Sequence, residues 1–328
     1  MKMEQPEQRQ PMSWTCPDRA SAPPYSRRAR TICTALMAVV GLFIAGCGNT
    51  DSSRGSTALG TTTPAAQQSP TAPARAASTR ALDSIVVLGH SGTTGYNSDP
   101  TRPNTDAPEN SWATGTNPKV DSIYRRLLAT HPALKGHTTS LGIDGSTVDD
   151  LAAQVDSMLS LDPLPDVVII QTVDNDIRCD GTDLANEKAF AKTLSDVLTT
   201  INRNDRYAQV FFVDQWGSVA MYAEATKNLP AAVAASSGTG PCDTFTASGR
   251  LQPAGVASLQ RIVDGYYGTV ERVCAEHRAC WTDRGALKRI SLTPADLTPD
   301  LDHLSLKGLP VMASFAWSAM PRAIKDRP

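Results

Sequence analysis

Ser91 lies in the turn Gly-His-Ser-Gly at 89–92, directly after the apolar run at 84–88. A glycine-flanked turn after a strand can present a serine hydroxyl above a sheet while the serine's own backbone N–H faces a bound oxyanion. The same turn is also compatible with an ordinary loop. It is not a phosphate-binding loop, because the pattern Gly-x-x-x-x-Gly-Lys-Ser/Thr is absent.

His303 is preceded, three residues earlier, by the carboxylate of Asp300. On a turn, Asp300 can accept the Nδ1 proton of the imidazole and leave Nε2 free to deprotonate a serine. Of the five histidines in the chain, only His303 has this spacing. An Asp-x-x-His sequence also occurs by chance, so it becomes informative only together with a serine partner.

Two further places offer hydrogen-bond donors to an oxyanion. Gly145 lies in the stretch 141–147, where a residue without a side chain lets a backbone N–H approach a ligand. The alternative is that this stretch merely starts a helix, with Ser146 or Thr147 as its cap. Asn175 follows another apolar run and can donate an amide N–H without bringing charge, although an Asn-Asp turn is also common in loops.

Short apolar runs alternate with amphipathic stretches around these places, a pattern typical of βαβ units and a parallel sheet. We expect strands within 84–88, 136–141, 167–170, 210–213 and 279–282, and helices around 120–128, 148–159, 190–201, 256–273 and 305–320. The continuous apolar run at 167–170 predicts a central strand that is buried on both faces. Because ligands bind at the carboxyl ends of parallel strands, the residues after each strand are the candidates for a site. We predict one α/β/α domain over 81–322, followed by a tail at 323–328.

In this order, Ser91, Gly145, Asn175 and Asp300 with His303 resemble the sequence blocks of the SGNH (GDSL-like) hydrolase superfamily, over nearly all of 84–320. The resemblance implies a three-layer α/β/α sandwich with a parallel, flavodoxin-like sheet. It also implies that Ser91 is the nucleophile, that His303 is its base and that Asp300 orients the imidazole. The backbone N–H groups of Ser91 and Gly145 and the Asn175 amide would form the oxyanion hole.

Members of that superfamily cleave acyl or acetyl esters, so the resemblance implies an esterase, a lipase or a carbohydrate acetylesterase. They need no metal and no organic cofactor, and we expect neither here. The implied partner is a small-molecule, lipid or glycan ester.

Two residues depart from the pattern of the superfamily. Its Gly-Asp-Ser reads Gly-His-Ser here, so His90 replaces an acid that usually braces the nucleophile turn. Its Gly-x-Asn-Asp begins with Val173, which would change the loop that aims Asn175. Neither change removes a reacting group.

Two alternatives to hydrolysis stay open at this point. An acyltransferase of the cell envelope would use the same triad and pass the acyl group to a sugar or lipid. A non-catalytic surface lipoprotein would keep the fold and bind envelope ligands. His90 and Val173 favour the second alternative, whereas the retained Ser91, Asp300 and His303 oppose it. The sequence gives no indication of the oligomeric state.

The N-terminal region has the features of an export signal. Arg27, Arg28 and Arg30 precede an apolar run at 31–45, which is shorter than the roughly 20 residues of a membrane-spanning helix. The run ends in Ile-Ala-Gly-Cys47, which resembles a bacterial lipobox with Cys47 as the lipidated residue. We therefore expect a signal at 1–46 and export to the outer face of the cytoplasmic membrane or the cell envelope, as in exported actinobacterial lipoproteins. The alternative is a retained anchor helix.

Residues 48–79 consist mainly of Ser, Thr, Ala, Pro and Gln, and they contain almost no large apolar side chain. Such a segment cannot bury enough surface to offset the entropy of ordering. We predict that residues 47–80 comprise the lipidated cysteine and a tether that holds the folded domain away from a membrane.

Four of the seven cysteines, Cys179, Cys242, Cys274 and Cys280, follow the predicted lipidation site. An even number suits disulfides in an oxidising compartment. Of the three possible connectivities we favour Cys274 with Cys280, by proximity, and therefore Cys179 with Cys242. A metal site is the competing interpretation, but no Cys-x-x-Cys pair and no cluster of histidines supports it.

The composition of the chain is that of a globular protein. Hydrophobic residues make up 41% of the chain, enough for a core, and a net charge of −2 gives no reason to expect nucleic acid as a partner.

Residues 215–251 lack periodicity apart from a short stretch at 221–228, and loops this long are usually functional or disordered. We hypothesise that this segment, with Trp216, Met221, Tyr222 and Phe245, covers the site and binds an acyl or glycan group. An inert surface loop is the alternative.

Overall fold

The computed structural model describes residues 80–328, so the predicted signal segment, Cys47 and the tether before residue 80 lie outside the described residues. In this part of the chain, five parallel strands form a sheet in the order β2-β1-β3-β4-β5. This is the flavodoxin-like strand order. The strands are β1 (Ile85–Gly89), β2 (Thr138–Ser140), β3 (Val167–Gln171), β4 (Gln209–Phe212) and β5 (Cys280–Thr282). Each overlaps a segment predicted to be a strand, and the predicted parallel α/β sheet is confirmed.

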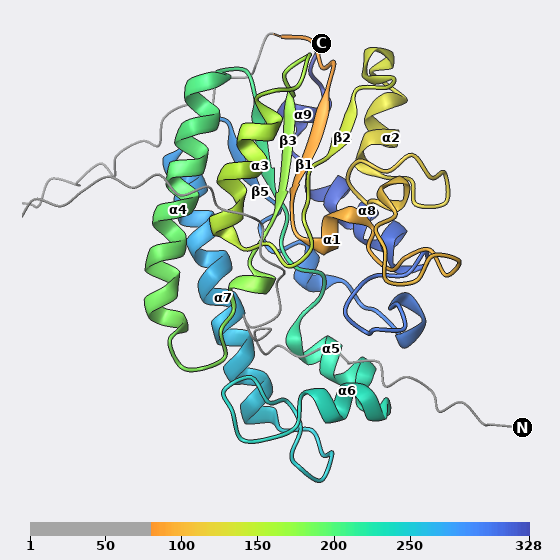
Figure 1. Ribbon diagram of the computed structural model, residues 1–328, viewed down its shortest axis with the longest axis vertical. Helices are drawn as coiled ribbons and strands as arrows, with labels where there is room; N and C mark the ends of the chain where they lie inside the picture. The colour runs from red at the N-terminus through yellow and green to blue at the C-terminus, as the bar shows by residue number, and fades with distance from the viewer. Residues whose placement is uncertain (1–79) are drawn as a thin grey trace, which may run out of the picture. The chain divides into compact units, whose positions relative to one another are not determined.

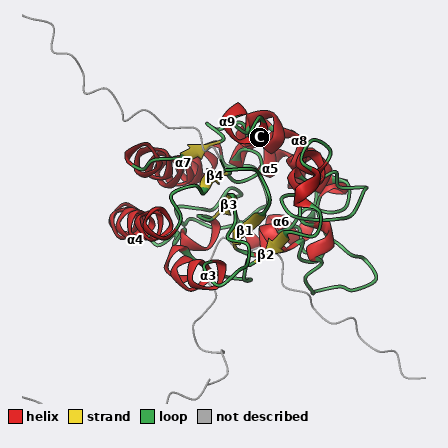
Figure 2. Ribbon diagram, turned by 90° about the horizontal axis from the view of Figure 1, so that it is seen from above, coloured by secondary structure: helices red, strands yellow, loops and turns green. Residues whose placement is uncertain are grey.

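Helices cover both faces of this sheet (Figures 1 and 2). Successive side chains of a strand point to opposite faces. Val168 and Val210 therefore pack with one group of helices, while Ile169 and Phe211 pack with another. The first group is α3 (Leu151–Met158), α4 (Asp183–Asn204) and α7 (Pro253–Glu276); the second is α2 (Ile123–Leu128), α8 (Gly308–Ala319) and α9 (Arg322–Lys325). The domain is a three-layer α/β/α sandwich, and residues 167–170 of its central strand are fully buried, as predicted.

Shorter elements connect these layers. The remaining α-helices of the described residues are α1 (Ser91–Thr94), α5 (Val219–Thr226) and α6 (Pro230–Ala235). The 3₁₀ turns are η1 (Pro108–Asn110), η2 (Pro132–Leu134), η3 (Val148–Asp150), η4 (Asp174–Asp176), η5 (Leu287–Arg289) and η6 (Pro294–Asp296). Several of them, including α1 and η4, begin directly after a strand, where a site in this type of sheet is built.

The strand order reverses between β1 and β3. The chain leaves β1 for the edge strand β2 and then returns to β3 on the other side of β1. Ligands of open α/β sheets bind at such a switch point, outside the carboxyl ends of the strands. Ser91 follows β1 and Asn175 follows β3, so both lie at this end of the sheet. Figure 1 shows α1 at this end, with α5 and α6 beyond it.

The segment at 215–251 contains more regular structure than the sequence predicts. Helix α5 matches the periodic stretch at 221–228, but α6 was not expected. Phe245 forms isolated β-bridges with Ser237 and Leu251, and its side chain is only 1% exposed. The segment is therefore folded around its own buried aromatic residue.

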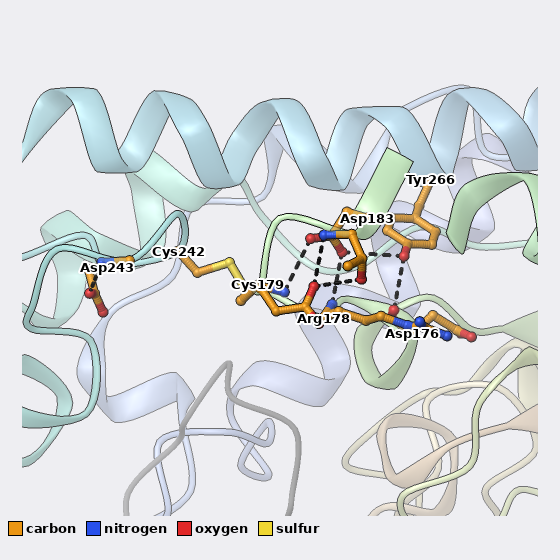
Figure 3. The surroundings of a disulfide bond; sticks show 10 residues. Asp176, Arg178, Cys179, Asp183, Cys242, Asp243 and Tyr266 are labelled. Carbon is orange, nitrogen blue, oxygen red and sulfur yellow. Dashed lines mark hydrogen bonds between the residues drawn. A yellow bond between two sulfur atoms is a disulfide. The ribbon is translucent and has the colours of Figure 1, made fainter. Parts of the chain in front are cut away.

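Both disulfides favoured from the sequence are present. Cys179–Cys242 joins the loop after β3 to the segment at 215–251, and Cys274–Cys280 joins the end of α7 to β5. Next to the first disulfide, the Asp183 carboxylate accepts the backbone N–H of Arg178 at 2.8 Å and that of Cys179 at 3.2 Å (Figure 3). The loop that carries Asn175 is thus fastened at its far end.

The C-terminal residues require a correction, because the predicted tail at 323–328 packs against the domain. Ile324 in α9 has no exposed surface. The guanidinium of Arg327 bonds the buried carboxylate of Asp166 at 3.1 Å, and the N–H of Leu82 donates to the carbonyl of Pro328 at 3.1 Å. A helix of four residues is too short to show a periodic pattern, which explains the error. Residues 80–328 contain no helix long and apolar enough to cross a membrane.

The two disulfides should differ in their effect on stability, because they close loops of different length. Their cysteines are 63 and 6 residues apart in the sequence. A cross-link stabilises mainly by restricting the unfolded chain, so Cys179→Ser with Cys242→Ser should lower the free energy of unfolding by about 4 kcal/mol, against about 2 kcal/mol for Cys274→Ser with Cys280→Ser. Urea unfolding of both double variants measures the difference. An equal or larger loss for the short loop would contradict the expectation.

Candidate active site

The turn that carries Ser91 is shaped by the close approach of β1 and β3. Gly89 ends β1 with φ +136°, and a Cβ on it would lie 1.9 Å from the carbonyl oxygen of Gln171. Only glycine fits there. Helix α1 then starts at Ser91, so the serine is presented at the carboxyl end of β1 and remains partly exposed.

The side chain of Ser91 meets those of His303 and Asp300, which lie more than 200 residues away in the sequence. The hydroxyl Oγ of Ser91 lies 2.8 Å from Nε2 of His303. Nδ1 of the same ring lies 3.1 Å from Oδ2 of Asp300. With Nδ1–H donating to the carboxylate, Nε2 is left as the acceptor for the serine proton. The geometry is that of an activated nucleophile, a base and a group that orients the base.

Asp300 is surrounded by hydrogen-bond donors. The amide of Asn97 and the hydroxyl of Thr298 both donate to its carboxylate. The backbone N–H groups of Asp302 and His303 donate at 2.8 and 3.2 Å. Burial opposes ionisation, but the hydrogen bonds from His303 and Thr298 outweigh it, so the pKa of Asp300 lies well below its usual range. The carboxylate is therefore ionised at any pH at which the protein would work.

The imidazole of His303 is mostly buried and faces negative charge from several elements. Burial lowers the pKa of His303, but the hydrogen bond with Asp300 and the charges of Asp302, Asp300 and Asp144 outweigh it and raise that pKa above its ordinary value. The ring of Tyr96 lies against the imidazole, with 4.8 Å between the ring centroids. The Asp300 carboxylate favours the tautomer with the proton on Nδ1, and the Tyr96 ring restricts the orientation of the imidazole.

Asn175 and Gly145, the predicted oxyanion donors, belong to neighbouring loops that contact each other. Nδ2 of Asn175 donates to the carbonyl oxygen of Ser146 at 3.0 Å, and the Ser146 hydroxyl donates to the carbonyl of Gly89 at 2.7 Å. An amide nitrogen carries two N–H groups, so one is left for a ligand. Gly145 has φ +70° and open space where a Cβ would be. The contacts with Gly89 hold both loops next to the turn of Ser91.

Val173 adopts a backbone conformation that favours glycine. Its φ is +106°, a conformation in which a β-branched residue is strained. The side chain is nonetheless 1% exposed and packs with the core beneath the loop. Burial of the Val173 side chain therefore holds the loop that carries Asn175 in a strained conformation, which a glycine would adopt without strain.

His90, at the position where the resemblance predicts an acid, supports the turn of Ser91. Its Nδ1 accepts the backbone N–H of Gly92 at 3.0 Å and caps α1. Its Nε2 lies 3.5 Å from the Asp174 carboxylate.

A small cavity of about 20 Å³ lies between the loop after β3 and the segment at 215–251. Its apolar wall is formed by Val173, Ile177, Trp216, Val219, Tyr222 and Val263. Tyr222 donates its hydroxyl to the carbonyl of Leu301 at 3.0 Å, between Asp300 and His303 in the sequence. Helix α5 of the segment at 215–251 therefore supports the loop of His303 as well as lining the cavity.

Several residues of the site were not predicted. Asn97 and Thr298 hold Asp300, and Tyr96 packs on His303. Gln154 accepts the N–H of Gly89 at 2.7 Å and steadies the end of β1. Asn97 and Asp300 are 203 residues apart, and a polar residue in an irregular stretch gives no signal of so distant a partner.

Comparisons with known proteins add likenesses of low identity. No protein-family model matches the chain, and no curated protein matches it. A structure described as a GDSL-like lipase from Parabacteroides merdae is 18% identical, with a TM-score of 0.44, over 73% of this chain and 96% of that one. An acetylxylan esterase from Geobacillus stearothermophilus is 18% identical, with a TM-score of 0.43, over 74% and 95%. A family 3 carbohydrate esterase from Clostridium thermocellum is 15% identical, with a TM-score of 0.41, over 72% and 93%.

Because the backbone of Val173 is strained, its glycine variant should be more stable than its alanine variant, which is the reverse of the usual order. In ordinary backbone, glycine is less stable than alanine, but at a positive φ alanine keeps the strain that glycine relieves. Both variants lose the apolar contacts of the valine side chain. Val173→Gly should therefore be more stable than Val173→Ala by about 1 kcal/mol in the free energy of unfolding. Chemical denaturation of the pair checks this, and a more stable alanine variant would show that the residue is unstrained.

Proposed function

We propose that this chain is a carboxylic ester hydrolase that works through an acyl-enzyme on Ser91. The observation that carries the proposal is the pair of contacts from Ser91 Oγ to His303 Nε2, at 2.8 Å, and from His303 Nδ1 to Asp300 Oδ2, at 3.1 Å. A serine hydroxyl is a weak nucleophile at neutral pH and needs such a base. In this arrangement Ser91 is partly exposed, so an ester carbonyl can reach it.

In the proposed mechanism, Ser91 Oγ attacks the ester carbonyl carbon while its proton passes to Nε2 of His303. Asp300 stabilises the imidazolium through Nδ1–H without itself taking the proton. The imidazolium then protonates the leaving alkoxide, and a water molecule deprotonated by His303 releases the acid. The negative charge on the carbonyl oxygen would be held by the N–H groups of Ser91 and Gly145 and by the Asn175 amide.

The small apolar cavity near Asn175 has room for little more than a water molecule, so the acyl length of the substrate is open. Its wall includes Val173, two residues before Asn175, and Tyr222, which bonds the loop of His303. Turnover of p-nitrophenyl esters of increasing acyl length would report how long an acyl chain the protein accepts.

We further propose that the protein is exported and anchored by lipid on Cys47. Its two disulfides are compatible with an extracytoplasmic location, because such bonds persist in oxidising compartments. A diacylated cysteine supplies the two or more chains that stable anchoring requires. In that setting the substrate would be an ester of the cell envelope or its surroundings.

Turnover of a short p-nitrophenyl ester by two variants tests the hydrolase. Ser91→Ala should abolish turnover, because it removes the nucleophile. Asn175→Ala should lower kcat by about 10² to 10³, the usual effect of losing one oxyanion donor. Asn204→Ala, an exposed amide at the end of α4, serves as the matched control and should not change kcat.

Thermal unfolding of each variant ensures that only folded proteins are compared. Unchanged kcat in Asn175→Ala would remove that residue from the oxyanion hole, and wild-type turnover in Ser91→Ala would overturn the proposed function. Analysis of products with and without envelope glycans then separates hydrolysis from acyl transfer.

A further inference from the structure

His90 is the residue next to Ser91, and it is buried, with 3% of its surface exposed. Its Nδ1 accepts the N–H of Gly92 at 3.0 Å, so the side chain of His90 caps the N-terminus of α1. A Cβ on Gly92 would lie 2.8 Å from Cε1 of His90. The imidazole can therefore occupy this place only because residue 92 is glycine.

The hydrogen bond from Gly92 also fixes the charge state of the ring. A nitrogen that accepts a hydrogen bond carries no proton, so in the neutral ring Nε2 carries it. Burial, followed by the positive charge of protonated His303, lowers the pKa of His90 to about 3. His90 thus stays neutral over the whole pH range in which His303 changes its charge.

Neutrality matters here because the surroundings are already acidic. Asp174 lies 3.5 Å from Nε2 of His90, and burial and the charge of Asp302 raise the pKa of Asp174 well above its ordinary value. His303 in turn faces Asp300 and Asp302 on its own loop and Asp144 from the loop after β2. A further carboxylate at position 90 would lie beside Asp174 and close enough for its charge to act on His303, as the charge of His303 acts on His90, so it would raise the pKa of both.

We propose that His90 is a positioning residue for Ser91: a neutral imidazole that braces the nucleophile turn through Gly92 without adding negative charge next to Asp174 and His303. The proposal rests on the proposed function of Ser91 and His303. It explains why a histidine can occupy the place of the acid in the family pattern. His90 itself does not touch the reacting atoms.

Three variants test separately the hydrogen bond from Gly92 to residue 90 and the charge of residue 90. Asparagine retains a neutral acceptor for the N–H of Gly92, because it is a good N-cap residue. Aspartate retains the acceptor but adds charge, and alanine removes the acceptor. His90→Asn should keep kcat within about threefold, whereas His90→Ala should lower kcat about tenfold with little change in KM, because the serine is misplaced.

The pH profile distinguishes aspartate from asparagine. His303 acts as a base only when neutral, so the acidic limb of kcat/KM follows its pKa, which lies above the ordinary value. The added charge in His90→Asp should raise that pKa and move the acidic limb upward by roughly half a pH unit. In His90→Asn the limb should stay where it is in the wild type.

NMR gives the same answers without turnover. Titration of the His303 ring protons reports its pKa in each variant, and hydrogen exchange of the Gly92 amide reports the brace. The Gly92 amide should exchange faster in His90→Ala than in the wild type, the asparagine variant or the aspartate variant.

If a folded His90→Ala variant keeps the wild-type kcat and the wild-type exchange rate of the Gly92 amide, His90 does not position Ser91 through Gly92. If the pKa of His303 is the same in His90→Asp as in the wild type, the neutral charge of His90 has no role. If the wild type hydrolyses no ester, the proposed function fails, and the NMR measurements still decide the role of His90.

Discussion

The hydrogen bond between Asp300 and Nδ1 of His303 determines which nitrogen of the imidazole faces Ser91. Without that acceptor, the ring could carry its proton on Nε2 and would then be unable to take one from the serine. The structure secures the bond by holding the carboxylate ionised with donors from Asn97 and Thr298 and from the backbone of its own loop. The rest of the site is built around this pair.

The parallel sheet makes such a pair available to a serine 212 residues away in the sequence. Ser91 follows β1, and Asn175 follows β3, so the switch point between these strands brings together the proposed nucleophile and a proposed oxyanion donor. His303, the proposed base, belongs to a separate loop before α8, and the Tyr222 hydroxyl on α5 donates a hydrogen bond to that loop. The segment at 215–251, which shows little periodicity in the sequence, therefore stabilises the loop of His303.

The sequence predicted the strands well because the central ones are continuous apolar runs, such as 167–170, which few other structures accommodate. It also singled out Ser91, Asp300 and His303 as candidates, because they occupy short motifs, and the folded chain brings these three side chains together. It did not predict α6 and α9, whose few residues show no periodicity. Nor did it indicate Asn97, Thr298 or the capping role of His90, since these depend on contacts that exist only after folding.

The decisive question is whether the Ser91 hydroxyl is activated, and covalent labelling with a fluorophosphonate answers it most directly. Intact mass and peptide mapping of the wild-type protein should show one label per chain, located on Ser91. The label should be absent after denaturation and in Ser91→Ala, and it should form far more slowly in Asp300→Asn. A folded wild-type protein that takes no label, or takes it on another serine, would contradict the account.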